Sequence, residues 1–248
     1  MIYHLEIEAK NCKVTALLNG FPVYRLNATY PAICSMPINI ALIDGINELL
    51  ISAIPVDLQP AAKDVPLFLL KGSVKCYPQD GVVGPENGTV IRTFDLSGQV
   101  AASVSFESNA FDFSYLLEKG KRIESDDIVR PYITHLETLM NSNNARGLTE
   151  EFSPRLRDYE LAFGLENNSL TVKFQSHITE NFFPAYPSQP FHEDLLLYTQ
   201  WCDGRIWEVT RIKEGVTDFF QTLDDEEGYN YSMAVFIGYV DEALKVVR

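Results

Sequence analysis

The most constraining feature of the sequence is a pair of alternating apolar runs on either side of Asp44-Gly45. Apolar residues alternate through residues 38–42 and again through residues 49–54. An Asp-Gly pair between two such runs is the strongest short-range signal for a β-hairpin, because glycine accepts the positive φ of a tight turn. Asn19-Gly20, which follows the apolar residues 14–18, predicts a second turn of the same kind. The N-terminal part of the chain is therefore expected to consist of strands joined by tight turns.

Short apolar runs recur over residues 1–108, with proline and glycine between them and almost no helical periodicity. Strands are expected at residues 3–9, 14–18, 38–42, 49–54, 67–70, 90–94 and 100–106. This spacing predicts an all-β sandwich.

The pattern becomes helical near residue 109. One helix is expected to begin at Ser125 and to end before Gly147, and a second to begin at Ser153, with Pro154 in its first turn, and to end at Gly164. Strands are then expected at residues 170–175, 194–200, 206–212, 231–240 and 244–247. Two helices followed by a run of strands indicate a C-terminal α+β domain.

Asp203-Gly204 predicts a hairpin between two of these strands. A two-residue turn would place Trp201 opposite Ile206 and Thr199 opposite Glu208. Leu197 would lie on the same face, so that Glu208 is surrounded largely by apolar side chains.

Two stretches of the N-terminal half resemble a known family. Leu17-Leu18-Asn19-Gly20 and residues 42–51 look like the L-N-G … L-x-x-G-x-N-x-L-x-V pattern of jelly-roll accessory domains. Those domains are similar to the galactose-binding-like modules found beside many sugar-acting enzymes. The resemblance implies a β-sandwich and carries over no ligand residue.

The order of elements over residues 125–248 is similar to the NTF2-like cone fold. In that family a curved antiparallel sheet wraps around helices and leaves a pocket at its open end. The resemblance implies helices on one face of a curved sheet, without any fixed functional residue. The expected fold is therefore two domains, an all-β sandwich at residues 1–108 and an α+β NTF2-like domain at residues 109–248.

The charge of the chain restricts its partners. Its formal net charge is −14, from 34 acidic against 20 basic residues, and no basic cluster contains interleaved aromatic residues. Such a chain repels phosphate backbones, so we expect no nucleic-acid partner and consider a basic protein the better electrostatic match. No run approaches the roughly 18 apolar residues of a membrane span, and no signal peptide precedes the first strand. We expect a cytoplasmic protein, with no membrane association and with its four cysteines reduced and mostly buried.

The common catalytic motifs are not found. The sequence has no G-x-G-x-x-G after a strand, no P-loop, no H-E-x-x-H and no G-x-S-x-G. The only local cluster of histidine with acidic residues is His192-Glu193-Asp194, which we interpret as a surface loop. No metal and no cofactor are expected, and the absence of these motifs favours a non-catalytic function.

The candidate partner-binding residues form one acidic and aromatic segment. Calcium loops need acidic ligands at alternate positions, whereas this segment has four in a row, so a cation site is not expected. Tyrosines beside carboxylates are typical of protein interfaces. The predicted partner-binding residues are Asp224, Asp225, Glu226, Glu227, Tyr229 and Tyr231.

The sequence thus favours a protein-binding function, for example an immunity or adaptor protein that neutralises a basic partner. The alternative is a small-molecule pocket in the C-terminal cone, lined by Trp201, Ile206 and Leu197. A carboxylate on an apolar face has its pKa raised by desolvation, so Glu208, beside Thr199, could be the acid/base residue of an isomerase or hydratase. A third hypothesis, carbohydrate binding by the sandwich, requires an exposed aromatic platform.

Overall fold

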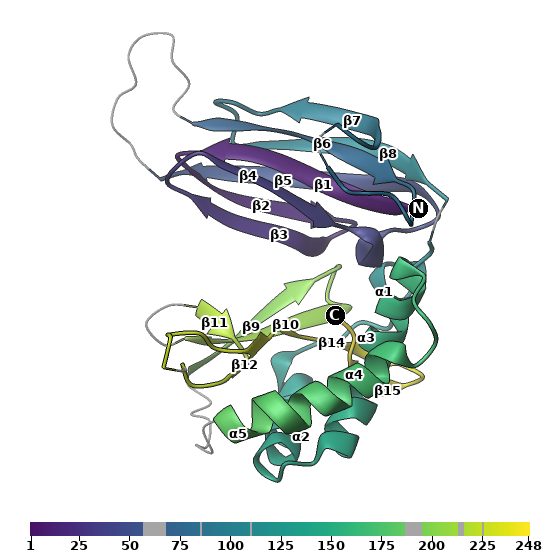
Figure 1. Cartoon of the computed structure of the whole chain (residues 1–248), viewed down its shortest axis with the longest axis vertical. Helices are drawn as coiled ribbons and strands as arrows, with labels where there is room; N and C mark the ends of the chain where they lie inside the picture. Colours follow the sequence, from purple (N-terminus) through teal and green to yellow (C-terminus); the bar gives the residue numbers. More distant parts are fainter. Residues whose placement is uncertain (57–67, 85, 110, 187–194, 213–215, 225) are drawn as a thin grey trace. The chain divides into compact units, whose positions relative to one another are not determined.

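The chain forms two compact units, Met1–Leu117 and Glu118–Arg248, in the computed structural model (Figure 1). It is mostly β-sheet, with a few helices. The structure describes residues 1–56, 68–84, 86–109, 111–186, 195–212, 216–224 and 226–248. None of the helices within these ranges is long and apolar enough to span a bilayer. The short helix α1 (Ser114–Leu117) belongs to the first unit, so the division falls later than the sequence analysis placed it.

The first unit contains two four-stranded antiparallel sheets, which Figure 1 shows face to face. One sheet has the order β4-β1-β6-β7, with strands Ala32–Pro37, Ile2–Lys10, Leu69–Tyr77 and Thr89–Asp95. The other has the order β3-β2-β5-β8, with strands Phe21–Ala28, Cys12–Leu18, Gly45–Pro55 and Ala101–Ser108. Alternate residues of these strands form the apolar core, which includes Leu5, Ile7, Val14, Ile51 and Val74.

The predicted strand at residues 38–42 is wrong, and Asp44-Gly45 is not a hairpin turn. This segment contains the 3-10 turn η1 (Asn39–Ala41), and residues 42–44 connect it to β5. The side chain of Asn39 causes the change, because its Oδ1 accepts the backbone N–H of Tyr3 at 2.7 Å. Gly45 does have a positive φ of 92°, but at the corner where β5 begins.

The turn at Asn19-Gly20 is confirmed. Both residues have positive φ, 51° and 80°, and they join β2 to β3, a strand that the sequence analysis missed. The side chain of Asn19 also reaches the start of β5, where its Nδ2 donates to Oδ1 of Asn47 at 2.8 Å. These two asparagines belong to the L-N-G and G-x-N parts of the motif, so the motif has a structural role in this chain.

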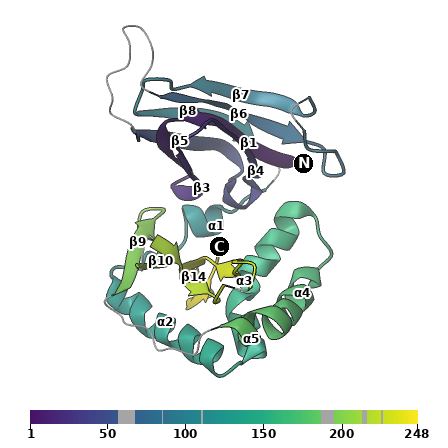
Figure 2. The same cartoon turned by 60° about the vertical axis from the view of Figure 1, so that its left-hand side comes forward.

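The second unit packs helices against a small antiparallel sheet. Its helical elements are α2 (Asp126–Asn141), α3 (Ala145–Phe163), α4 (Ser169–His177), the π-helical segment η2 (Ile178–Phe182) and α5 (Phe183–Ala185). The sheet strands are β9 (Leu196–Trp201), β10 (Ile206–Ile212), β11 (Val216–Asp218), β14 (Val235–Val240) and β15 (Ala243–Val246). Figure 2 shows α2, α5 and α4 in an arc around β10 and β14. A separate two-stranded ribbon pairs β12 (Phe220–Gln221) with β13 (Ser232–Met233).

The predicted start of the second helix is wrong. Helix α3 begins eight residues before Ser153, after Asn144, whose side chain accepts the N–H of Gly147 at 2.9 Å. Pro154 lies inside the helix, where it has no N–H to donate to the carbonyl of Glu150. The hydroxyl of Ser153 donates to that carbonyl instead, at 2.9 Å, so the helix continues through the proline.

The predicted strand at residues 170–175 is also wrong, since this segment lies in helix α4. The cause is a carboxylate on the preceding helix. Glu160 of α3 accepts the backbone N–H groups of Asn168 at 2.9 Å and Leu170 at 2.7 Å, and so satisfies donors at the N-terminus of α4. Gly164 ends α3 with a φ of 59°, as predicted.

The four cysteines are free, with Cys12, Cys76 and Cys202 buried and Cys34 half-buried. Burial raises the pKa of the Cys202 thiol to about 12, although the positive charges of Arg248 and Arg205 oppose this shift. At about pH 8 only roughly one Cys202 thiol in ten thousand would be a thiolate, which is the reactive form.

We therefore expect iodoacetamide to label Cys34 well before Cys202 in the folded protein. Peptide mapping by mass spectrometry, with and without urea, measures this order, and equal native labelling of both residues would contradict it.

Candidate functional site

The predicted acidic segment lies in the connection between strands β12 and β13. Asp224, Glu226 and Glu227 are exposed there, and Asp225 lies outside the described residues. The exposed apolar side chains Leu223 and Tyr229 accompany them, with 61% and 69% of their surfaces accessible. The structure thus brings carboxylates and apolar surface together on one short connection, which we call the acidic loop (residues 222–231).

The acidic loop is held at its base. The backbone N–H of Thr222 donates to the carbonyl of Tyr231 at 2.9 Å, and the N–H of Tyr231 donates to the Thr222 hydroxyl at 2.9 Å. Asn230 Nδ2 donates to the Asp224 carboxylate at 2.7 Å. The rings of Tyr231 and His177 form a T-shaped pair with centroids 5.1 Å apart. Tyr231 is therefore partly an anchor, whereas Tyr229 is more exposed.

Glu208 lies in the hairpin β9–β10, whose predicted register is confirmed. Thr199 is opposite Glu208 and Trp201 is opposite Ile206, and the turn places Asp203 and Gly204 at positive φ. Glu208 is only 5% exposed, and Trp201 Nε1 donates to its carboxylate at 3.0 Å. Of the predicted pocket residues, Ile206 is buried and Leu197 is 40% exposed.

The helix-facing side of this sheet is filled with apolar side chains. Trp207 and Val209, which alternate with Glu208 along β10, pack in one cluster with residues of the helices and of β14 and β15, including Val129, Ile133, Leu136, Phe152, Phe182, Ile237 and Val246. Since successive residues of a strand point to opposite faces, Glu208 points away from this cluster. The space between the sheet and the helices is therefore filled with apolar side chains, and Glu208 does not face it. This side of the sheet gives the acid/base hypothesis for Glu208 no support.

One cluster of ionisable side chains was missed because its members come from three elements. Glu151 of α3 accepts the hydroxyl of Tyr132 at 2.7 Å and Lys245 Nζ at 3.1 Å, and lies 3.4 Å from His135 Nε2. Burial and the Glu151 carboxylate raise the pKa of Tyr132. This cluster links α2 (Tyr132 and His135) to α3 and β15. The predicted cluster at residues 192–194 lies outside the described residues.

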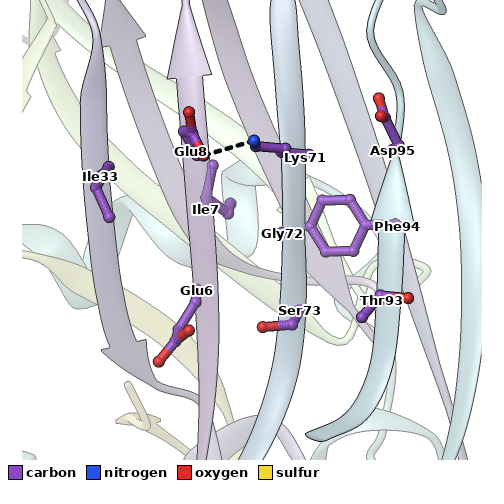
Figure 3. A pocket seen from close by; sticks show the side chains of 10 residues that line it. All are labelled: Glu6, Ile7, Glu8, Ile33, Lys71, Gly72, Ser73, Thr93, Phe94 and Asp95. Carbon is purple, nitrogen blue, oxygen red and sulfur yellow. Dashed lines mark ion pairs between the residues drawn. The ribbon is translucent and has the colours of Figure 1, made fainter. Parts of the chain in front are cut away.

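A groove of about 500 Å³ lies on the sheet β4-β1-β6-β7 of the first unit (Figure 3). The sequence did not predict this groove, because it exists only once strands far apart in the sequence are paired. The strand register forms two polar rows across β1, β6 and β7, namely Glu8, Lys71 and Asp95, and Glu6, Ser73 and Thr93. Gly72 and the ring of Phe94 lie between the two rows (Figure 3).

The charges around the groove are partly paired. Lys71 Nζ lies 3.0 Å from the Glu8 carboxylate, and Lys75 Nζ lies 2.8 Å from that of Glu6. Glu6 also accepts the hydroxyl of Tyr77 at 2.7 Å. Burial acts to raise the pKa of Glu6, but the hydrogen bonds from Lys75 and Tyr77 outweigh it, so the pKa lies below its usual value. The pKa of Tyr77 is raised to about 12 by burial and by its hydrogen bond to Glu6.

Among the residues that the structure describes, no group of three or more His, Cys, Asp or Glu side chains could hold a metal ion. Comparisons with family models, with curated proteins and with solved structures return no match for this chain.

Proposed function

We propose that this protein binds a basic partner protein through the acidic loop. The observation that carries the proposal is the exposed combination of carboxylates with Leu223 and Tyr229 on a connection that is fixed at its base. Aromatic residues are enriched in protein interfaces, and a fixed loop loses less conformational entropy on binding than a free one. The net charge of −14 would favour encounter with a basic surface.

In its most concrete form, the proposal describes a cytoplasmic immunity or adaptor protein that neutralises a basic protein. The second unit would then be an NTF2-like scaffold, with helices on a curved antiparallel sheet and its interior filled rather than open. The packed cluster around Trp207 and Val209 supports the use of this unit as a scaffold.

The test compares two triple variants of the full chain. D224N/E226Q/E227Q neutralises the acidic loop, and D80N/E86Q/E107Q removes the same charge from exposed positions of the first unit. We expect affinity capture with the unmodified protein to recover a stoichiometric basic partner. The purified partner should bind the loop variant at least about tenfold more weakly, because rim charges steer association. Its affinity for the control variant should change little.

A third variant, Tyr229→Ser, tests the apolar part of the acidic loop and should weaken binding severalfold without changing the dependence of binding on salt. Two results would overturn the proposal. One is the absence of any stoichiometric partner, and the other is equal binding of the partner to both triple variants.

A further inference from the structure

The shape of the groove in the first unit depends on a glycine, which has no side chain. Gly72 stands between Lys71 and Ser73 on β6, and a Cβ at this position would lie 2.1 Å from the carbonyl oxygen of Glu6 and 2.6 Å from Cζ of Phe94. Only glycine fits there without a shift of its neighbours. Figure 3 shows the Phe94 ring extending from β7 toward Gly72, with Lys71 and Asp95 on one side of it and Ser73 and Thr93 on the other.

The lining of the groove is negatively charged overall. Among the described residues that line the groove are the carboxylates of Glu6, Glu8 and Asp95 and one cation, Lys71. Glu8 is paired with Lys71, and Glu6 with Lys75, which lies outside the lining. Asp95 accepts the backbone N–H of Ser97 at 2.9 Å, which together with the serine hydroxyl holds the pKa of Asp95 below its usual value.

An arginine side chain matches this arrangement. Its guanidinium is planar and always charged, stacks on aromatic rings, and forms paired hydrogen bonds with carboxylates. The half-buried ring of Phe94 supplies the stacking surface, and Asp95 lies next to it on β7. Ile33, which is 82% exposed at the β4 side of the groove, offers apolar contact to a neighbouring part of the same ligand. The volume of about 500 Å³ is within the range of ordinary ligand sites.

We propose that the Gly72–Phe94 groove binds an arginine side chain presented by a basic peptide segment, with the guanidinium on the Phe94 ring and beside Asp95 and Glu8. This inference does not depend on the acidic loop, which belongs to the other unit. The two proposals can therefore fail separately.

The experiment uses the full chain and a short peptide in which arginine alternates with glycine, studied by calorimetry at about 0.15 M ionic strength. The sharpest variants are Glu8→Gln and Lys71→Gln. Both break the same exposed ion pair, which contributes little to stability, but they change the charge of the groove in opposite directions. We expect Glu8→Gln to weaken binding about threefold to tenfold and Lys71→Gln to strengthen it by a similar factor.

Further comparisons separate the guanidinium from other ligands. Phe94→Leu should weaken binding about tenfold through the lost stacking. Glu107→Gln on the other sheet and D224N/E226Q/E227Q should leave the affinity almost unchanged. The same peptide with citrulline, the neutral analogue of arginine, should not bind measurably. Equal binding of the citrulline peptide, or shifts in the same direction for Glu8→Gln and Lys71→Gln, would overturn the proposal.

Discussion

Replacing Asp158 by alanine is expected to lower the free energy of unfolding of the second unit by about 3–5 kcal/mol. Asp158 of α3 forms an ion pair with Arg248 near the end of β15, and the two residues are only 4% and 2% exposed. Arg248 also donates to the carbonyl of Val247 at 2.7 Å. Removal of the Asp158 carboxylate would take this negative charge away from a buried guanidinium, which costs far more than the loss of a surface ion pair.

The two tryptophans make this effect measurable in one unit. Trp201 and Trp207 both lie in the second unit, so tryptophan fluorescence during urea unfolding reports on that unit. The double variant Asp158→Leu/Arg248→Met replaces the pair by apolar side chains of similar size and should recover most of the lost stability. If Asp158→Ala lowered the free energy of unfolding by less than about 1 kcal/mol, this would show that water solvates the ion pair in solution.

The sequence predicted well the features that are determined by a few neighbouring residues. The hairpin around Asp203-Gly204 has its expected register, because the turn length fixes which residues face each other. The last two predicted strands, residues 231–240 and 244–247, correspond to the antiparallel pair β14 and β15, and Asp241 and Glu242 between them have positive φ of 49° and 64°. In each case the backbone conformation of the turn residues determines which residues of the two strands pair.

The errors arose where a distant side chain determines the local structure. Asn39 bonds to Tyr3 and replaces the expected strand by a 3-10 turn, and Glu160 caps helix α4 from the preceding helix. Neither partner can be identified from the pattern of the affected segment. Alternating apolar residues over 170–175 therefore favoured a strand where the tertiary contact selects a helix.

The acidic loop is determined by neighbouring residues, whereas the groove is determined by residues far apart in the sequence. The acidic loop is one continuous segment, so its composition was visible in the sequence. The groove combines Glu8 of β1 with Lys71 of β6 and Asp95 of β7, and it depends on the register of three strands. Charge alternation along one strand is common on exposed faces, and gave no reason to select these residues.

Replacing Asn47 by alanine is expected to lower the free energy of unfolding of the first unit by about 3 kcal/mol or more. Asn47 is fully buried at the start of β5. Its Oδ1 accepts the N–H of Ile43 at 2.9 Å and Nδ2 of Asn19 at 2.8 Å, and its own Nδ2 donates to the carbonyls of Ile43 and Gly45, both at 3.0 Å. Alanine would leave several of these groups without a partner, and unsatisfied buried groups cost more than a lost exposed hydrogen bond.

The measurement is urea unfolding followed by far-ultraviolet circular dichroism, with tryptophan fluorescence recorded in parallel. The first unit contains neither tryptophan. A loss of stability confined to the first unit should therefore shift the dichroism transition and leave the fluorescence transition in place. Asn27→Ala on the exposed face of β3 is the matched control and should change stability by less than about 0.5 kcal/mol. If Asn47→Ala behaved like this control, the Asn19–Asn47 network would not stabilise the first unit. An equal shift of both transitions would instead show that the two units unfold together, so that a loss at Asn47 destabilises the whole chain.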